Sequence, residues 1–534
     1  MHEKLIESLQ ICCPLQVTNP YTPTRLLDVG ETFDDIPHLV LTQAFNNNPS
    51  QRRIEYAALS YCWGSPSDAA TNIKSEQCSL DSFLNAVDFY SMPPAIQDAV
   101  TACRAFSIRY LWVDTLCIIQ DDQDDWEEES RNMGRIFENA YVTLCALASS
   151  SCCQGFLRRS LRSTTIPFQS VVDPDISGAY ILTYRPGPGD DKYFCERDDF
   201  AFYFDLEYSR WITRAWTFQE QYLSNRMLLF GESRIHFLCG HYMYSENTFD
   251  DRQSYFRPLA PYLADAELCG SQANAIKSLY GIWYSVSADY NLRSLTYPKD
   301  KLPAVAGIAS YVADATKDEY VVGLWRKDLT RGLIWYRRPD KSWDNHIQNL
   351  LLPNITNIPS WSWLIHNMYF EMGTVYFQIS DKVKTIPECT VLDVEINLAG
   401  PNAFGCINKA TLTISGRVIL SPSVLFRSSV QQRVFYTWNI HFDGHCVYHC
   451  SLDWLYKGDI LQPPQGLALL KVTSCLTYTF EDEISVNNVV WGLLLIPTEN
   501  YGEYRRVGVF SSHRFIRSEH DPFKDCELQT IRLI

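Results

Sequence analysis

The sequence predicts an α/β protein whose parallel-sheet core is followed by a helical extension and a β-rich C-terminal module. Between residues 56 and 148, apolar runs of strand length alternate with helical patterns, an order typical of a parallel sheet covered by helices. After about residue 385, short alternating runs such as ATLTISGRVIL and NNVVWGLLLI are typical of a sandwich or a partly open barrel. The predicted parts are an N-terminal extension over residues 1–50, an α/β domain over 51–240, a mainly helical region over 241–384 and a β-rich domain over 385–534.

The first strand and the first helix of the core are marked by apolar spacing and by turn residues. Residues 56–64 (YAALSYCWG) are largely apolar and end at glycine, which predicts a buried strand. Pro93 and Pro94 mark the start of a helix, because proline is tolerated in the first helical turn. The apolar side chains of this helix recur on one face: Ile96, Ala99, Val100, Cys103 and Phe106.

Two more strands and a second helix complete the predicted core. Residues 110–119 (YLWVDTLCII) are almost continuously apolar, as expected of a strand covered on both faces. Asp124 or Asp125 is predicted to cap the helix that follows. Residues 141–148 (YVTLCALA) predict the third strand, and residues from about 205 to 340 are expected to be mainly helical.

Composition and charge limit the class of partner. The chain has 534 residues and a net charge of −16, which argues against non-specific binding to nucleic acid or anionic lipid, because both are polyanions. The N-terminal residues lack the basic segment and apolar segment of a secretory signal, so the 18 cysteines are expected to be reduced. The longest apolar runs fall far short of the roughly 20 residues that span a bilayer. We therefore expect a cytoplasmic protein that binds neither nucleic acid nor a membrane.

Three blocks of sequence resemble, in order, the heterokaryon-incompatibility (HET) domains of filamentous fungi. The first is ALSYCWG at residues 58–64, and the third is RAWTFQE at residues 214–220. The second and most specific block is YLWVDTLCIIQD at residues 110–121, which continues through Trp126, Glu129, Met133 and Ile136 to Asn139 and Ala140. Shorter pieces such as PSWSW at residues 359–363 and YRRVG at 504–508 also resemble the extended family, although the specific resemblance ends near residue 240.

This resemblance carries expectations about fold and function. HET domains are similar to TIR domains, which have a flavodoxin-like fold and in several lineages cleave NAD with a glutamate on a helix. HET proteins are associated with cell death after the fusion of genetically different hyphae. The resemblance therefore implies a TIR-like core and a role in fungal non-self recognition, with NAD as a candidate substrate and no predicted resident cofactor.

Glu129 is the first candidate catalytic residue. On a helical wheel it shares an arc with the apolar residues Trp126 and Met133, whereas Glu127 and Glu128 fall outside that arc. A carboxylate that faces a core is costly unless it is paired or functional. The resemblance makes Glu129 correspond to the TIR glutamate and makes Trp126 a ligand contact, although the spacing from tryptophan to glutamate is i, i+3 here and i, i+4 in the usual TIR pattern. The structural alternative is a buried glutamate bonded to arginine or to a backbone amide.

Asp114 is the second candidate catalytic residue. It lies in an apolar run, so it needs a partner, for which Arg214 or the Ser60–Tyr61 region is proposed. Asp114 and Cys117 are predicted to lie on one strand at i and i+3, and therefore on opposite faces. No nearby basic group is visible that would activate Cys117, so it is interpreted as a packed thiol.

Polar residues at the ends of the first two strands are candidate ligand contacts, because doubly wound folds bind ligands at the carboxyl ends of their strands. Glycine there permits close backbone approach. Neither GxGxxG nor GxxxxGK[ST] is present, so neither a Rossmann nor a Walker site is predicted. The candidates at this edge are Ser60, Tyr61, Trp63, Gly64, Gln120 and Asp121.

The third block is predicted to begin a helix that packs on the sheet. Arg214 is suited either to anchor a phosphate or to pair with a core carboxylate. Trp216, Gln219 and Glu220 are candidates to line the same cleft. The structural alternative is an ion pair that joins this helix to the rest of the core.

Two other kinds of site are disfavoured. Asp443-Gly444 predicts a hairpin that places Phe442 opposite His445 and His441 opposite Cys446, which separates a group of histidines and cysteines that otherwise has zinc-like spacing. Ser-His-Asp hydrolysis has no motif support, because GxSxG is absent and none of the 11 histidines lies in the three blocks.

Three functional hypotheses follow. The leading one is a HET-domain protein of non-self recognition and cell-death signalling that cleaves or binds NAD or another nucleotide. The second is a stand-alone cyclase, isomerase or hydrolase of fungal secondary metabolism that uses the same cleft for a small molecule. The third is a non-catalytic interaction module that assembles with itself or with a protein partner.

Overall fold

The structure is a computed structural model in which the chain forms two compact units, Met1–Ala264 and Asp265–Ile534. The residues that it describes are 20–45, 54–159, 162–184, 200–240, 242–246, 252–253, 272–337, 357–367, 369–372, 383–420, 424–428, 438–442, 445–453, 460–461, 465–478, 486–512 and 521–534.

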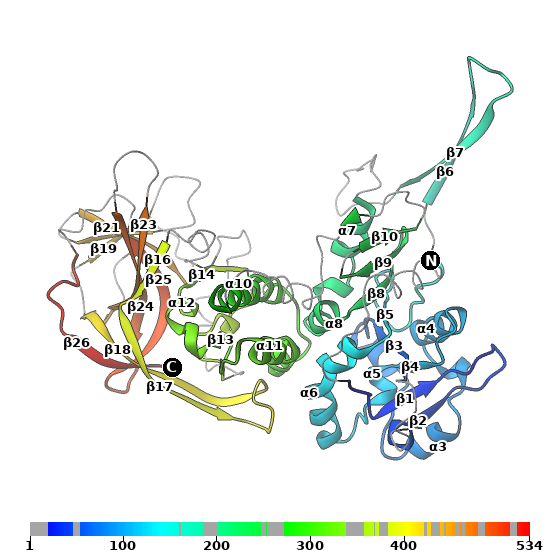
Figure 1. Cartoon of the computed structure of the whole chain (residues 1–534), viewed down its shortest axis with the longest axis horizontal. Helices are drawn as coiled ribbons and strands as arrows, with labels where there is room; N and C mark the ends of the chain where they lie inside the picture. The colour runs from blue at the N-terminus through cyan, green and yellow to red at the C-terminus, as the bar shows by residue number, and fades with distance from the viewer. Residues whose placement is uncertain are drawn as a thin grey trace. The chain divides into compact units, whose positions relative to one another are not determined.

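The first unit is built on a nine-stranded sheet with the order β11-β10-β9-β8-β5-β3-β4-β1-β2 (Figure 1). The four central strands, β8, β5, β3 and β4, are mutually parallel, which confirms the predicted α/β core with a parallel sheet. The flanking strands pair antiparallel. The strands are β1 (Arg25–Asp28), β2 (His38–Leu41), β3 (Tyr56–Ser60), β4 (Tyr110–Trp112), β5 (Val142–Cys145), β8 (Arg226–Phe230), β9 (Ile235–Cys239), β10 (Tyr242–Ser245) and β11 (Arg252–Gln253).

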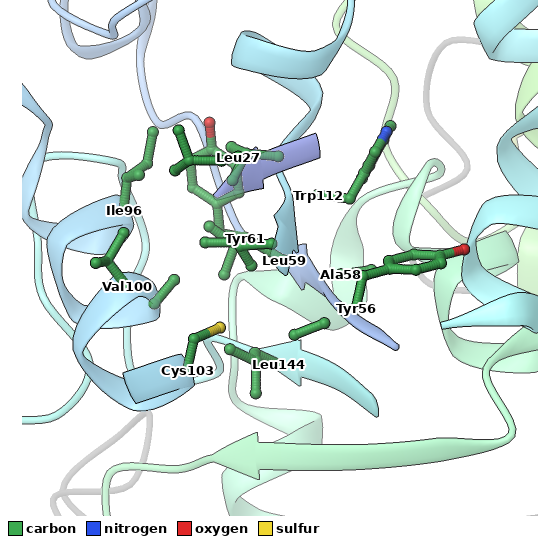
Figure 2. Packing of buried hydrophobic residues seen from close by; sticks show 14 of the residues in the cluster. Leu27, Tyr56, Ala58, Leu59, Tyr61, Ile96, Val100, Cys103, Trp112 and Leu144 are labelled. Carbon is green, nitrogen blue, oxygen red and sulfur yellow. The ribbon is translucent and has the colours of Figure 1, made fainter. Parts of the chain in front are cut away.

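Helices cover both faces of this sheet. Figure 2 shows Ile96, Val100 and Cys103 of α4 pointing toward the side of the sheet that carries Leu59 and Leu144. The helices of the unit are α2 (Pro66–Ala70), α3 (Leu80–Asn85), α4 (Pro94–Ala105), α5 (Asp114–Cys117), α6 (Gln123–Asn139), α7 (Phe200–Glu207) and α8 (Thr217–Leu223). Proline 93 is the N-cap of α4, so this helix begins where the sequence predicted.

The other face of the sheet packs against α6. The Tyr56 hydroxyl donates to the carbonyl of Ile136, 2.6 Å away, and the Trp112 and Phe137 rings meet edge to face at 5.6 Å. Ser60 has the same parity as Tyr56 along β3, because side chains alternate between the faces of a strand. It therefore points to the side of the sheet on which α6 lies, and α8 lies against α6.

The prediction of one strand over residues 110–119 was wrong. Strand β4 ends at Trp112, and Asp114–Cys117 form one helical turn in which the Cys117 amide donates to the Val113 carbonyl at 2.7 Å. The Asp114 carboxylate accepts from the Thr115 amide at 2.7 Å, which stabilises the start of this turn. A short apolar run cannot distinguish a buried strand from a buried helical turn by periodicity. Asp114 and Cys117 are therefore not on opposite faces of a strand, and the strand does not end at Gln120.

Two smaller expectations also need correction. The N-cap of α6 is Asp122, whose carboxylate accepts from the amides of Asp124 and Asp125 at 3.0 and 3.1 Å, so neither of those two residues is the cap. Strands β8, β9 and β10 lie at Arg226–Phe230, Ile235–Cys239 and Tyr242–Ser245, although residues 205–340 were predicted to be mainly helical. Gly231 and Gly240 separate these strands in the sequence, and short apolar runs such as RMLLF and IHFLC do not by periodicity alone distinguish a strand from a helix.

A separate hairpin, β6 (Arg162–Gln169) and β7 (Ser177–Tyr184), extends from the first unit (Figure 1). These strands pair only with each other in the part of the chain that the structure describes. The side chains of Val171 and Val172 at its turn are 99% and 96% exposed. The hairpin side chains whose burial the structure describes thus lie outside the core of the unit.

The second unit combines helices with a large, mostly antiparallel sheet, which confirms the predicted β-rich C-terminal region. Its elements before residue 380 are α10 (Gln272–Tyr290), α11 (Pro303–Thr316), β12 (Tyr320–Val321), β13 (Leu324–Trp325), α12 (Leu329–Gly332), β14 (Trp335–Arg337) and β15 (Phe370–Met372). The strands of the large sheet are β16 (Val383–Pro387), β17 (Cys389–Leu398), β18 (Ile407–Leu420), β19 (Val424–Ser428), β20 (Trp438–Phe442), β21 (His445–Leu452), β22 (Ile460–Leu461), β23 (Ala468–Tyr478), β24 (Val486–Pro497), β25 (Glu503–Ser512) and β26 (Leu528–Leu533).

Five of these strands close into a ring. Strand β18 pairs with β23 and β26, β24 pairs with β23 and β25, and β25 pairs in parallel with β26. Such closure leaves no free edge within the ring. Of the two alternatives that the sequence left open, the partly open barrel is the nearer description.

The downstream pieces that resemble the extended HET family form one structural junction in the second unit. The Ser360 hydroxyl accepts from the Arg506 amide at 3.0 Å, and the Trp335 indole donates to the Trp361 carbonyl at 2.9 Å. Trp363 donates to the Gly323 carbonyl at 2.8 Å, where Gly323 has a φ of +90°. These contacts assign the PSWSW and YRRVG segments to packing.

None of the helices in the described ranges combines the length and apolar character needed to cross a membrane.

Candidate functional site

Two of the three sequence blocks meet at the carboxyl edge of the parallel sheet. Trp63 follows β3, and its indole Nε1 donates to Asp114 Oδ2 at 2.9 Å. Asp114 opens α5 directly after β4, the strand that neighbours β3. The predicted carboxylate in an apolar run therefore has its partner across the neighbouring strand.

The environment of Asp114 is mixed. Burial raises the pKa of its carboxyl group, whereas the Arg214 guanidinium and the hydrogen bonds from Trp63 and Thr115 lower it. The residue still reaches the surface in part. A largely enclosed carboxylate with a perturbed pKa is a candidate for binding a polar ligand.

Tyr61 lies beside this carboxylate. Its hydroxyl is 3.3 Å from the Thr115 hydroxyl and accepts from the Asn72 amide at 2.8 Å. Burial, reinforced by the charge of Asp114, raises the pKa of Tyr61 well above its usual range, so its hydroxyl stays protonated. The sequence did not single out Asn72 or Thr115, and nothing in their spacing marks them.

Arg214 brings the third block to the same place. It follows a short 3₁₀ turn, Trp211–Thr213, and its Nη1 donates to the Tyr61 carbonyl. Burial raises the pKa of Asp114 and of Cys62, and the Arg214 charge offsets part of each rise. Of the two partners predicted for Asp114, Arg214 acts on it through its charge, and in the Ser60–Tyr61 region Tyr61 acts on it through a hydrogen bond, whereas Ser60 bonds to Glu220 and Trp211. We call Tyr61, Trp63, Asp114 and Arg214 the sheet-edge site.

Ser60 and Glu220 form a second, more buried contact at the end of β3. The Ser60 hydroxyl donates to Glu220 Oε2, and the Trp211 indole donates to Ser60 Oγ at 2.5 Å. Glu220 is 6% exposed and raises the pKa of the nearby Cys145 thiol, although burial is the larger cause of that shift. Trp211 was missed by sequence reasoning, since it lies three residues before the third block.

Gly64 is required by the turn that follows Trp63. Its φ is +92°, and a Cβ atom at this position would lie 2.6 Å from Asp68 Oδ2 and 2.7 Å from the Ser151 hydroxyl. The left-handed backbone and the close neighbours both favour glycine. The predicted close approach at Gly64 is therefore made by this protein's own side chains.

Of the remaining predicted ligand residues, Gln120 contacts the sheet-edge site, whereas the other described contacts and burial do not join Asp121, Trp126, Trp216 or Gln219 to it. The Gln120 amide donates to the carbonyls of Asp114 and Ile118, each at 3.1 Å. Asp121 accepts from the Gln77 amide at 2.9 Å. Trp126 and Trp216 are partly buried against the core, and Gln219 is buried within α8.

Glu129 lies in a different cluster, with the first strand of the sheet. It is 1% exposed, which agrees with its predicted inward orientation, and its Oε1 is 3.8 Å from Arg25 Nη2. Arg25 is held more closely by Asp125, at 2.6 Å, and by the Cys117 carbonyl, at 2.7 Å. Burial raises the pKa of Glu129, while Thr24 and Arg25 lower it. Arg25 lies outside the three blocks, so no motif identified it as the partner of Glu129.

The histidine- and cysteine-rich segment follows the register that the sequence predicted. Phe442 pairs with His445 and His441 with Cys446 in strands β20 and β21, while Asp443 and Gly444 lie outside the described residues. Within the described ranges, no group of three or more histidine, cysteine or acidic residues is placed to hold a metal ion.

A comparison with protein families agrees with the resemblance of the three sequence blocks. Residues 56–220 match the family described as Heterokaryon incompatibility protein (HET). The chain is also 29% identical over 89 residues to Epoxide hydrolase A of Mycobacterium tuberculosis (strain ATCC 25618 / H37Rv), which covers 16% of this chain and 28% of that protein. The chain thus spans less than a third of the length of this relative. No solved structure matches the chain.

Proposed function

We propose that this chain, which carries a HET domain over residues 56–220, acts in fungal non-self recognition and cell-death signalling by cleaving NAD at the sheet-edge site. The observation that carries the proposal is the convergence of Trp63, Asp114 and Arg214, from three separate blocks, at the carboxyl ends of parallel strands. An indole, a carboxylate and a guanidinium suit the base, the ribose hydroxyls and the pyrophosphate of a dinucleotide.

The strand order supports a TIR-like, flavodoxin-like core. Numbered by their order in the chain, the parallel strands β3, β4, β5 and β8 are arranged 4-3-1-2 across the sheet. This is the first part of the flavodoxin-like order 2-1-3-4-5, read from the other side. In that fold ligands bind at the switch point between the first and third strands, here β3 and β5, and the sheet-edge site begins at the end of β3.

Asp114 is the better placed of the two candidate catalytic carboxylates. It is partly exposed, whereas Glu129 is 1% exposed and faces Arg25. In the proposed reaction the bond between nicotinamide and the ribose carbon breaks, and nicotinamide leaves with the bonding electron pair. The ionised carboxylate stabilises the positive charge that develops on the ribose, and water adds to that carbon. The products are nicotinamide, ADP-ribose and one proton.

Nicotinamide release by the full-length protein tests this proposal. Wild type, Asp114→Asn, Glu129→Gln and Asp124→Asn are incubated with NAD, and products are separated by chromatography. Asp124 is an exposed carboxylate at the start of α6 and serves as the control. We expect Asp114→Asn to lower the rate about 10²-fold or more and Asp124→Asn to leave it unchanged.

Other outcomes of this experiment would move the catalytic role to Glu129 or refute NAD cleavage. Loss of activity in Glu129→Gln together with full activity in Asp114→Asn would transfer the catalytic role to Glu129. A wild-type protein that stays inert toward NAD, even when concentrated enough to self-associate, would refute NAD cleavage. The cellular role is tested separately by expressing wild type and Asp114→Asn in a filamentous fungus and scoring cell death, where wild type alone should kill.

A further inference from the structure

A second polar constellation lies in the first unit and shares no residue with the sheet-edge site. Asp205 is in α7, His236 in β9 and Ser245 in β10. His236 Nε2 is 3.0 Å from Asp205 Oδ2, and His236 Nδ1 is 2.7 Å from the Ser245 hydroxyl. The three side chains therefore form a continuous hydrogen-bonded chain from a carboxylate through an imidazole to a hydroxyl.

The fold holds these three side chains in place from two sides. Ser245 and His236 are directly opposite in the antiparallel pair β9–β10, so their side chains lie on the same face. The Asp205 side chain packs directly against Gly231. A Cβ atom at position 231 would lie 2.2 Å from Asp205 Oδ2, so glycine leaves the space that this carboxylate occupies. Asp205 and His236 are 1% and 0% exposed, whereas Ser245 is partly exposed. The acid and the base are thus enclosed, and the serine is only partly buried.

The surroundings of Asp205 determine which imidazole nitrogen carries the proton. The Asp205 carboxylate also accepts from the Ser233 amide at 3.1 Å, from the Ser233 hydroxyl at 2.5 Å and from the Arg234 amide at 3.2 Å. These contacts and His236 together lower the pKa of Asp205 against the effect of burial, so the group is an ionised acceptor. His236 Nε2 must then be the donor. In a neutral imidazole Nδ1 is consequently the acceptor, and the Ser245 hydroxyl donates to it.

We propose that Ser245 is the nucleophile of an acyl-transfer site, with His236 as its general base, Asp205 as the residue that orients the base, and a carboxylic ester as the substrate class. A serine whose proton faces a base that is itself oriented by a carboxylate is the arrangement that activates a hydroxyl for attack on a carbonyl. Such a constellation is recognised by geometry and not by its order along the chain.

The chemistry is balanced without any further group. Ser245 Oγ adds to the ester carbonyl while its proton passes to His236 Nδ1, and the resulting imidazolium faces the Asp205 carboxylate. The C–O bond of the ester then breaks, and the departing alcohol takes the proton from His236. Water, deprotonated by His236, adds to the acyl-Ser245 ester, and breakdown releases the carboxylic acid and restores the serine.

Covalent labelling of the full-length protein tests this assignment. Wild type, Ser245→Ala, His236→Gln and Ser82→Ala are treated with a fluorophosphonate probe, and the modified peptide is identified by mass spectrometry. Ser82 is an exposed serine of α3 and is the matched control. We expect labelling at Ser245 in wild type and in Ser82→Ala, and at least a hundred-fold slower labelling in the other two variants.

A second readout removes the dependence on the buried variant. With p-nitrophenyl acetate, wild type should form an acetyl adduct on the Ser245 peptide and release p-nitrophenol in a burst, whereas Ser245→Ala should do neither. A hydroxyl that serves only as a cross-strand hydrogen bond would give no adduct. Absence of both the phosphonate and the acetyl adduct from Ser245 in the folded wild type would overturn the proposal, as would equal turnover by Ser245→Ala.

Discussion

The two candidate catalytic carboxylates, Asp114 and Glu129, have different surroundings. Asp114 is bound by the Trp63 indole at 2.9 Å, whereas Glu129 and Asp125 share the single guanidinium of Arg25. A buried charge whose partner is removed is strongly destabilising, because its desolvation is no longer offset. Removing the partner of a buried carboxylate is therefore expected to destabilise the fold.

Removing Arg25 should expose this dependence. Arg25 is 6% exposed on its side chain, so Arg25→Met leaves two acidic side chains without their cation. We expect the free energy of unfolding to fall by about 3–5 kcal/mol. The control variant Arg532→Met removes the cation of a pair with Glu395 in which both side chains are about half exposed. The free energy of unfolding should then fall by only about 0–1 kcal/mol. Urea unfolding measures both, and similar losses in the two variants would contradict the argument.

Lys301 gives a pH-dependent prediction. Burial lowers the pKa of its amine to about 7, although its Nζ donates to the His366 carbonyl and to Asn367 Oδ1. Between about pH 7 and the ordinary lysine pKa, the unfolded chain binds one proton more than the folded chain, so stability rises with pH. Below about pH 7 both states are protonated, and the full cost of burying the charge is present.

The variant Lys301→Met should abolish this slope. From about pH 7 to pH 9, the unfolding free energy of wild type relative to Lys301→Met should rise by up to about 1.4 kcal/mol per pH unit. Lys299→Met removes an exposed amine two residues away and should track wild type. Parallel pH profiles for wild type and Lys301→Met in urea unfolding would show that the amine is not shifted.

At the scale of elements, the boundaries of β4, α5 and α6 position the sheet-edge site. Because β4 stops at Trp112, the chain turns through α5 and places Asp114 next to Trp63. Asp122 then caps α6, which carries Glu129 along the sheet toward Arg25. A strand that continued to residue 119 in the same register would have placed Asp114 level with Ser60 of β3.

The cap of α6 can be tested directly. Asp122 accepts from two backbone amides at the start of the helix, so Asp122→Ala should lower the unfolding free energy by about 1 kcal/mol. Asp124→Ala removes a neighbouring acidic residue that makes no capping bond and should change stability by no more than about 0.5 kcal/mol. A larger loss in Asp124→Ala than in Asp122→Ala, measured by thermal or urea unfolding, would reassign the cap.

At the scale of the whole molecule, the chain has separate hydrophobic cores in its two units. The core of the first unit surrounds β3, β4 and β5 (Figure 2), and that of the second lies among the strands of the large sheet. Each unit is large enough to bury its own core, as expected for domains of this length. Cooperative unfolding is therefore expected within each unit.

Core truncations should separate the two transitions. Leu144 lies in the core of the first unit and Leu469 in that of the second, and both are 0% exposed. Leu144→Ala and Leu469→Ala should each lower the stability of their own unit by about 2–5 kcal/mol. Differential scanning calorimetry should show a different transition shifted in each variant. A single transition that both variants shift equally would mean that the two units unfold together.

The sequence by itself determined the parallel-sheet core, the start of α4, the inward orientation of Glu129, the register of the β20–β21 hairpin and the β-rich C-terminal region. These features follow from local periodicity, proline and hairpin turn chemistry, which are written into short stretches of chain. The HET resemblance also named residues that meet at one edge, because parallel strands bring their carboxyl ends together.

Only the tertiary structure decided the partners. Arg25 beside Glu129, Trp211 on Ser60, and the chain from Asp205 through His236 to Ser245 each join residues far apart in sequence. No spacing rule predicts such pairs, because they depend on which strands and helices pack together in the folded protein. The same holds for the turn at Asp114, where a buried apolar run is compatible with strand or helix until its neighbours impose one of them.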